Sequence, residues 1–276
     1  FWMDSLGNNR SGALRPNRNR VFATDLNLTE GAELLSFVDR YDFLRQDLLA
    51  WDAANGHGLG ADALGFVAAA AAGVQADTAE GFNVEGLAMA ADGSSAWLAF
   101  RAPLRPRGAA LPALIVPVLN FAALVVDDQP GSRPQGSASF GAPIFLDLGG
   151  RSIRSIERGA DGDYLILAGP PDYASDVPPS DFRLFLWSGE VTDSPRALPI
   201  TLPAVPLQGS YEAIVGFDSG LDVGGGSVEL LLDNGDAVFY GDGVIAKDLG
   251  ERRFAKFTAL RLQVPTAALF SNGFEP

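Results

Sequence analysis

The chain has 276 residues, of which 47% are hydrophobic and 20% are charged, and its formal net charge is −14 at pH 7. Nucleic acid is bound by clustered Lys and Arg side chains, so this acidic balance argues against nucleic acid as a partner. The chain contains no cysteine, which excludes disulfides, thiolate nucleophiles and cysteine-ligated metal clusters.

The first 80 residues combine a loop, two strands and a helical region. Residues 1–20 are rich in Gly, Asn and Arg and predict a long loop. Residues 21–26 and 32–40 are expected to form a strand pair. Leu44, Leu48 and Trp51 recur at helical spacing, and an alanine-rich run covers residues 63–74. We therefore expect a helical insertion at about 41–80 in an otherwise β chain.

From Phe82 onward, short apolar runs alternate with Gly, Pro, Asn and Asp, which is typical of strands joined by turns. The runs group into two sets of four and one set of three. The first set lies at 84–91, 96–102, 113–119 and 143–148, the second at 152–158, 164–169, 182–188 and 198–202, and the third at 211–217, 228–234 and 258–264, with a turn-rich excursion at 235–253.

One hairpin pattern recurs in these sets. Its first copy covers residues 82–103 and turns at Asp92-Gly93; a second begins at Ser155 and turns at Asp161-Gly162, and a third opens at Tyr211. Radial repetition of such hairpins is typical of a β-propeller with four-stranded blades. A β-sandwich is the alternative, but it does not require the same hairpin to recur.

We expect one propeller domain over residues 1–264, followed by a C-terminal tail at 265–276. If residues 21–40 belong to an earlier blade, the chain holds about four blades, at the low end for a closed ring. We therefore expect that one or more N-terminal blades are missing from this chain.

Several motifs resemble those of a known family. They are GNNRSGALRPNRNRVFAT at 7–24, NVEGLA at 83–88, LAFRAP at 98–103, LIVPVLN at 114–120, PIFLDLGGRSIRSIER at 143–158, YLILAGP at 164–170 and LFLWSG at 184–189. Together they resemble an uncharacterised bacterial β-propeller family, a domain of unknown function distantly similar to phytase-like and lactonase-like propellers. The resemblance covers roughly residues 2–264 and implies a propeller. The ending LFSNGFEP resembles C-terminal tails of secreted Gram-negative proteins, which implies export to the periplasm or the medium.

The innermost strands of propeller blades start at one face, so equivalent positions converge. We take Glu85, Glu157 and Glu212 as equivalents, with Asn120 ending a run that returns to the same face. Carboxylates gathered in this way repel one another unless a cation or protons neutralise them. Oxygen ligands without His or Cys suit Ca²⁺. The alternatives are that each Glu bonds backbone amides of the next blade, or that the carboxylates share protons in acid–base chemistry.

Arg101 and Arg154 lie near these glutamates in the repeat scheme. They could bind a phosphate or carboxylate group through bidentate contacts, or they could simply pair with neighbouring glutamates. The single histidine, His57, lies in a glycine-rich turn and is interpreted as a loop residue.

These features lead to two hypotheses. The first is a calcium-dependent hydrolase of phosphoesters or lactone-like esters, in which the metal polarises the scissile group as the resemblance to lactonase-like propellers implies, and Arg101 or Arg154 orients an anion. The second is a non-catalytic propeller that binds a ligand or a protein. The expected partner is a small anionic or ester substrate.

The most apolar stretch, residues 111–126, is too short and too broken by proline for a membrane span.

Overall fold

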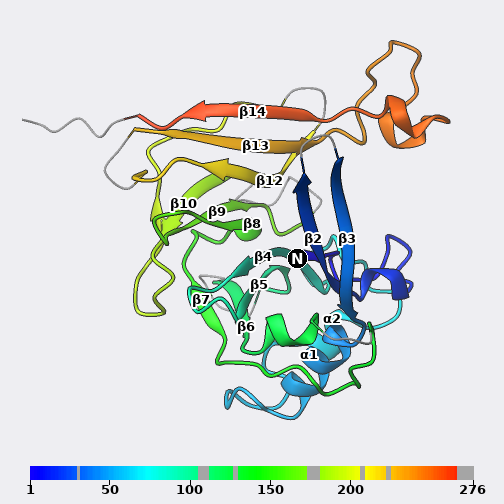
Figure 1. Cartoon of the computed structure of the whole chain (residues 1–276), viewed down its shortest axis with the longest axis vertical. Helices are drawn as coiled ribbons and strands as arrows, with labels where there is room; N and C mark the ends of the chain where they lie inside the picture. The colour runs from blue at the N-terminus through cyan, green and yellow to red at the C-terminus, as the bar shows by residue number, and fades with distance from the viewer. Residues whose placement is uncertain are drawn as a thin grey trace, which may run out of the picture.

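A computed structural model describes residues 1–29, 32–104, 112–126, 130–172, 181–205, 209–221 and 225–265. The described chain is all-β: its strands form four antiparallel sheets of three or four strands, with few helices (Figure 1). This confirms the expectation of an all-β chain, although the described residues show no closed propeller ring. The predicted tail lies outside the described residues from position 266 onward.

Each sheet is built from consecutive strands. The first contains β1 (Trp2–Met3), β2 (Val21–Thr29) and β3 (Ala32–Tyr41); the second contains β4 (Asn83–Met89), β5 (Ala96–Ala102), β6 (Ala113–Val118) and β7 (Ile144–Leu146). The third contains β8 (Ser152–Arg158), β9 (Tyr164–Gly169), β10 (Arg183–Trp187) and β11 (Arg196–Ala197); the fourth contains β12 (Ser210–Phe217), β13 (Ser227–Asp233) and β14 (Thr258–Gln263). In every sheet the spatial order of strands follows the chain, so each strand pairs with its neighbour in sequence.

The last three sheets contact one another in succession through their first strands: β4 lies against β8, and β8 lies against β12. Alternating side chains fill the two interfaces. Ile153, Ile156 and Trp187 are buried in the first, and Leu165, Leu230 and Tyr211 in the second. All six residues of β9 are buried, because this strand packs against a neighbouring sheet on each face. A strand buried on both faces has a nearly continuous apolar sequence. The stacking of the sheets thus brings the three first strands side by side.

The predicted helical insertion is shorter than expected. Its helices are α1 (Leu44–Ala53) and α2 (Phe66–Ala69), and a third short helix, α3 (Phe121–Leu124), follows β6. Tyr41 belongs to β3 rather than to a helix. The alanine-rich run gives a single turn because Gly65 and Gly73 have positive φ values of 71° and 89° and interrupt it on both sides. No helix in the described part of the chain is long and apolar enough to cross a membrane.

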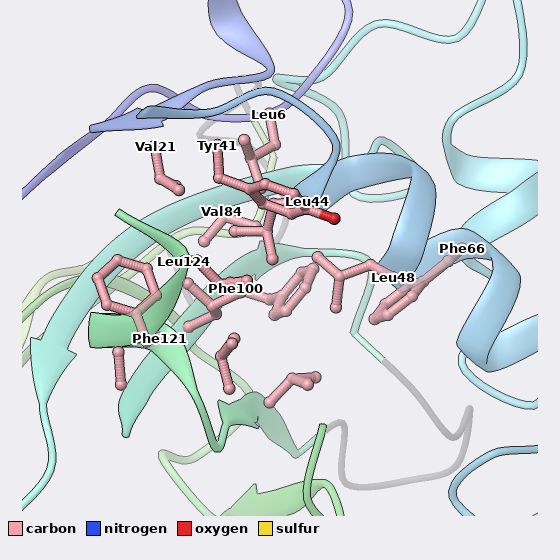
Figure 2. Packing of buried hydrophobic residues seen from close by; sticks show 14 of the residues in the cluster. Leu6, Val21, Tyr41, Leu44, Leu48, Phe66, Val84, Phe100, Phe121 and Leu124 are labelled. Atoms are coloured by element: carbon pink, nitrogen blue, oxygen red, sulfur yellow. The ribbon is translucent and has the colours of Figure 1, made fainter. Parts of the chain in front are cut away.

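The largest core cluster joins this helical region to the second sheet (Figure 2). Leu44 and Leu48 of α1 pack with Phe66 of α2 against the sheet. The Phe66 ring stacks on Phe100 at 5.0 Å, and Phe82 meets both rings edge to face. All three rings are almost fully buried, so the helical region is part of the same hydrophobic core as the β scaffold.

Buried polar side chains fasten the loop at 1–20 to the helical region. Arg45 of α1 donates to the Leu6 carbonyl at 2.9 Å and to Asn8 Oδ1 at 3.0 Å. The Asn8 amide donates in turn to the carbonyls of Ala71 and Val74. This loop, which contains β1 and a 3-10 turn at Pro16–Arg18, is therefore held in place rather than solvated throughout.

One smaller expectation is corrected. The apolar run at 198–202 is not a strand; the fourth strand of its sheet is the two-residue β11, because Pro199 and Pro203 remove the amide donors that a ladder needs. The excursion at 235–253 contains the 3-10 turns Ala246–Asp248 and Arg252–Phe254. The strand pair predicted at 21–26 and 32–40 is confirmed as β2 and β3, with longer bounds.

We predict that Phe100→Ala lowers the free energy of unfolding by about 3–5 kcal/mol, because it leaves a cavity among three buried aromatic rings. Chemical denaturation measures this loss. The control is Phe257→Ala, whose ring is 69% exposed and whose removal should change stability by no more than about 0.5 kcal/mol. Equal losses in the two variants would contradict the assignment of the core.

Candidate functional site

The first strands of the last three sheets each carry an extra residue at the same position. In β4, Val84 and Gly86 pair with the adjacent residues Phe100 and Ala99, which leaves Glu85 unpaired. The same two-against-one pairing leaves Arg154 as the extra residue of β8 and Glu212 as the extra residue of β12. A β-bulge turns its extra residue out of the regular alternation of the strand. Because β4, β8 and β12 lie side by side, the three bulges aim their side chains at one place.

A chain of ion pairs joins these side chains. Arg154 Nε lies 2.9 Å from Glu85 Oε2, and Arg154 Nη2 donates to Glu212 Oε1 at 2.5 Å. Arg101, which is itself an extra residue of β5, donates from Nη1 to Glu85 Oε1 at 3.0 Å. The order is therefore Arg101, Glu85, Arg154, Glu212, with alternating charge. We call these four residues the arginine–glutamate chain.

Burial differs along the arginine–glutamate chain. The side chains of Arg154 and Arg101 are only 5% and 9% exposed, and that of Glu85 is 17% exposed. Glu212 is the most open, at 33%. Buried charges of this kind persist only when they are paired and hydrogen-bonded. Asn83 supports the pairing by donating its amide to Glu85 Oε1 at 3.0 Å.

The pKa of Glu212 is raised above its ordinary value. Burial is the largest cause, and the nearby negative charge of Glu85 adds to it. The positive charges of Arg154 and Arg101 act in the opposite direction but do not cancel the effect of burial. Glu212 is thus the member of the arginine–glutamate chain whose protonation the surroundings favour.

A cavity of about 530 Å³ opens beside the arginine–glutamate chain, and we call it the central cavity. It is lined by Arg10, Asp77, Arg101, Arg154, Pro170, Asp172, Phe182, Gly209, Ser210, Glu212, Asp233, Gly235 and Asp236. A second cavity of about 430 Å³ is lined by Met3, Asp4, Ser5, Val84, Glu85, Leu87, Arg154 and Glu212. Arg154 and Glu212 line both cavities, so their ion pair stands between the two.

Of the residues expected from the sequence, Glu85, Glu212, Arg101 and Arg154 come together. The simpler interpretation of the arginines, pairing with neighbouring glutamates, is what the structure has. The equivalence assigned to Glu157 is wrong: strand register makes Arg154 the counterpart of Glu85 and Glu212. Glu157 is the acidic residue of its run, but it lies only four residues before Asp161, whereas Arg154 lies seven residues before Asp161, as Glu85 does before Asp92.

Glu157 and Asn120 lie elsewhere. Glu157 is three residues beyond Arg154, about 10 Å along an extended strand, and it lines a separate cavity of about 300 Å³ with Phe1, Leu87, Ala88, Met89 and Arg158. Burial raises the pKa of Glu157. Asn120 precedes α3 and fastens a loop, donating to the Ser137 carbonyl and accepting from the Ser139 amide, both at 2.9 Å.

The four expected calcium ligands therefore do not form one site. Glu85 and Glu212 already have arginine partners, and Glu157 and Asn120 face other surroundings. Across the described ranges, no group of three or more His, Asp or Glu side chains could hold a metal ion. Calcium binding stays a hypothesis.

Sequence reasoning missed part of the cavity wall. The motif Asp233-Asn-Gly-Asp236 predicts only a tight turn, and Phe182 begins the apolar run at 182–188. The turn interpretation is correct locally, since Asp233 Oδ1 accepts the Gly235 amide at 2.7 Å. Only the packing of β13 beside β12 shows that this turn also faces the arginines.

His57, the single histidine, hydrogen-bonds to buried Asp52 at 2.8 Å inside the helical region.

Comparison of the chain with family models, with curated proteins and with solved structures finds no match.

We predict that Arg154→Met lowers the free energy of unfolding by about 2–4 kcal/mol, because it leaves two carboxylates without their shared cation; the partial exposure of Glu212 moderates the loss. The matched control is Arg183→Met, which breaks an exposed pair with Asp181 and should cost at most about 1 kcal/mol. Urea denaturation of both variants checks the prediction, and a loss at position 154 no larger than at 183 would refute it.

A pH dependence follows from Glu212. Its folded-state pKa is raised, so above the ordinary carboxyl value of about 4.3 the folded state binds more protons than the unfolded state. Stability contributed by this group is present below that pH and is lost as the pH rises toward the folded-state pKa. Glu212→Gln should flatten this fall in unfolding free energy. Identical pH profiles for the variant and the parent protein would show that Glu212 is not the group responsible.

Proposed function

We propose that the four sheets are blades of a β-propeller and that the central cavity is a ligand site beside the propeller axis. The meandering strand order of each sheet and the side-by-side first strands support this assignment. The motif resemblance described above is consistent with it. In this arrangement the bulged residues of successive blades face the axis, where ligands of propellers are accommodated.

The proposed function is non-catalytic binding of a small ligand through an anionic group, a carboxylate or a phosphoester. The observation that carries it is that each of the two buried arginines, Arg101 and Arg154, has a guanidinium nitrogen without a hydrogen bond to any described residue. Both line the central cavity, and within the described residues Arg101 Nη2 and Arg154 Nη1 make no hydrogen bond. A guanidinium with an unused nitrogen on a cavity wall is a donor suited to carboxylate or phosphate oxygens.

The partners of these arginines fix them for this purpose. Arg101 is held by Glu85 and by the Pro171 carbonyl, which accepts from Nε at 3.3 Å. Arg154 is held between two glutamates and lies over the Phe182 ring at 6.0 Å. Long side chains held in this way lose little conformational entropy when a ligand binds. The glutamates thus orient the arginines and leave one guanidinium nitrogen of each without a partner among the described residues.

Calorimetric titration with inorganic phosphate and with butyrate, a monocarboxylate, at constant ionic strength, tests this function. We expect saturable binding, weakened about 10- to 100-fold in Arg101→Lys, which keeps the charge but loses the guanidinium fork. Arg183→Lys, at an exposed position outside the cavity lining, is the control and should bind like the parent protein. No binding of either anion, or equal affinity in Arg101→Lys, would contradict the proposal.

A second candidate is the calcium-dependent hydrolase of phosphoesters or lactone-like esters. Five acidic residues line the same cavity as the arginines. Carboxylate oxygens that could bind Ca²⁺ and guanidinium groups that could bind an anion are therefore present in one cavity. We expect millimolar Ca²⁺ added after EDTA to raise the unfolding temperature if the native state binds it, and Glu212→Gln to abolish turnover. No thermal shift and no turnover on a panel of phosphoesters and lactones would leave the binding function alone.

A further inference from the structure

We propose that the central cavity selects a zwitterionic ligand, whose anionic group binds Arg101 and Arg154 and whose cationic amine binds the carboxylate of Asp233, with Asp236 beside it. This inference rests on the proposed function and names the class of its ligand. Its basis is that two arginines of the cavity wall come from the second and third sheets and two aspartates come from the fourth.

The positive part of the wall comes from the second and third sheets. Arg101 is on β5 and Arg154 on β8, and both are almost fully buried. Both residues line the cavity, and each has one guanidinium nitrogen without a hydrogen bond among the described residues. Negative charge comes from the fourth sheet, where Asp233 ends β13 and Asp236 follows in the next turn, and also from Asp77 before β4 and Asp172 after β9. The two arginines and Asp233 therefore belong to different sheets around the same cavity, so one ligand can meet both donors and acceptors.

The carboxylate of Asp233 has capacity for a ligand. Asp233 is exposed, and its Oδ1 accepts the Gly235 amide, while among the described residues Oδ2 has no hydrogen-bond partner. Asp233 pairs in register with Ser210, which lines the cavity two residues before Glu212. Asp236 is paired with Lys247, but both side chains are about two-fifths exposed. Such a surface pair is worth little, so a ligand amine could replace the lysine.

The balance of charge favours a ligand that is not purely anionic. The described lining contains three arginines and five acidic residues. A dianion would gain contacts at the arginines but would be repelled by the surplus carboxylates, whereas a zwitterion matches both ends. Phe182 lies beside Arg154 in the same lining and offers an apolar surface to the methylene spacer between the two charged groups.

The test compares pairs of ligands that differ only in the amine. Straight-chain ω-amino acids, from glycine to 6-aminohexanoate, are titrated calorimetrically against the unsubstituted carboxylates of the same length, from acetate to hexanoate. We expect the amino acid to bind about 10-fold more tightly than its carboxylate at the chain length that spans the cavity, because a charge-assisted hydrogen bond is added. Shorter members should show no such preference.

Asp233→Asn should abolish the preference for the amine while leaving carboxylate affinity unchanged or slightly higher. The matched control is Asp147→Asn. Asp147 is also exposed, and its Oδ1 also accepts the amide of the glycine two residues on, Gly149, at 2.9 Å, but it does not line the central cavity. This control removes the same kind of turn hydrogen bond and should keep the preference.

The outcomes separate the two proposals. If neither member of any pair binds, the proposed function fails. If carboxylates bind but the amine adds nothing at any length, or if Asp233→Asn keeps the preference, the zwitterion inference fails alone. Tighter binding of gluconate than of every amino acid would likewise overturn it, because the carboxylates would then be recognising hydroxyl groups.

Discussion

The contact on which the site depends is the double ion pair of Arg154 with Glu85 and Glu212. It joins the first strands of three successive sheets at one point. Burying these charges costs desolvation that pairing repays only in part, and apolar residues often hold such positions equally well. We infer that the pair serves mainly to specify position: it fixes a guanidinium between two cavities, with Arg101 oriented beside it by the same glutamate.

The β-bulges make this contact possible. A regular strand would alternate its side chains between two sheet interfaces that are already filled by apolar residues. An extra residue in β4, β8 and β12 leaves that alternation locally and places a charged side chain outside the apolar layers. Hydrophobic packing thus determines how the sheets stack, and the bulges determine where the polar site lies within the stack.

The sequence predicts strands well because alternating apolar runs and Asp-Gly turns are local signals, and Glu85, Glu212, Arg101 and Arg154 could be selected on that basis. The assignment of Glu157 failed because it followed residue type and not position: the residue seven places before the second Asp-Gly turn, equivalent to Glu85, is the arginine Arg154. Asp233 and Asp236 were missed as cavity residues for a different reason: their turn pattern is complete by itself, and only the packing of β13 on β12 brings them opposite the arginines.

The most direct measurement of the central claim is the position of a bound oxyanion. Crystals grown with selenate, whose geometry resembles that of phosphate, would locate the anion by the anomalous scattering of selenium. The account predicts a selenium peak in the central cavity within hydrogen-bonding reach of Arg101 Nη2 and Arg154 Nη1, with both glutamates still paired. An empty cavity with selenate bound at other surface arginines, or guanidinium groups turned away from the cavity, would contradict it.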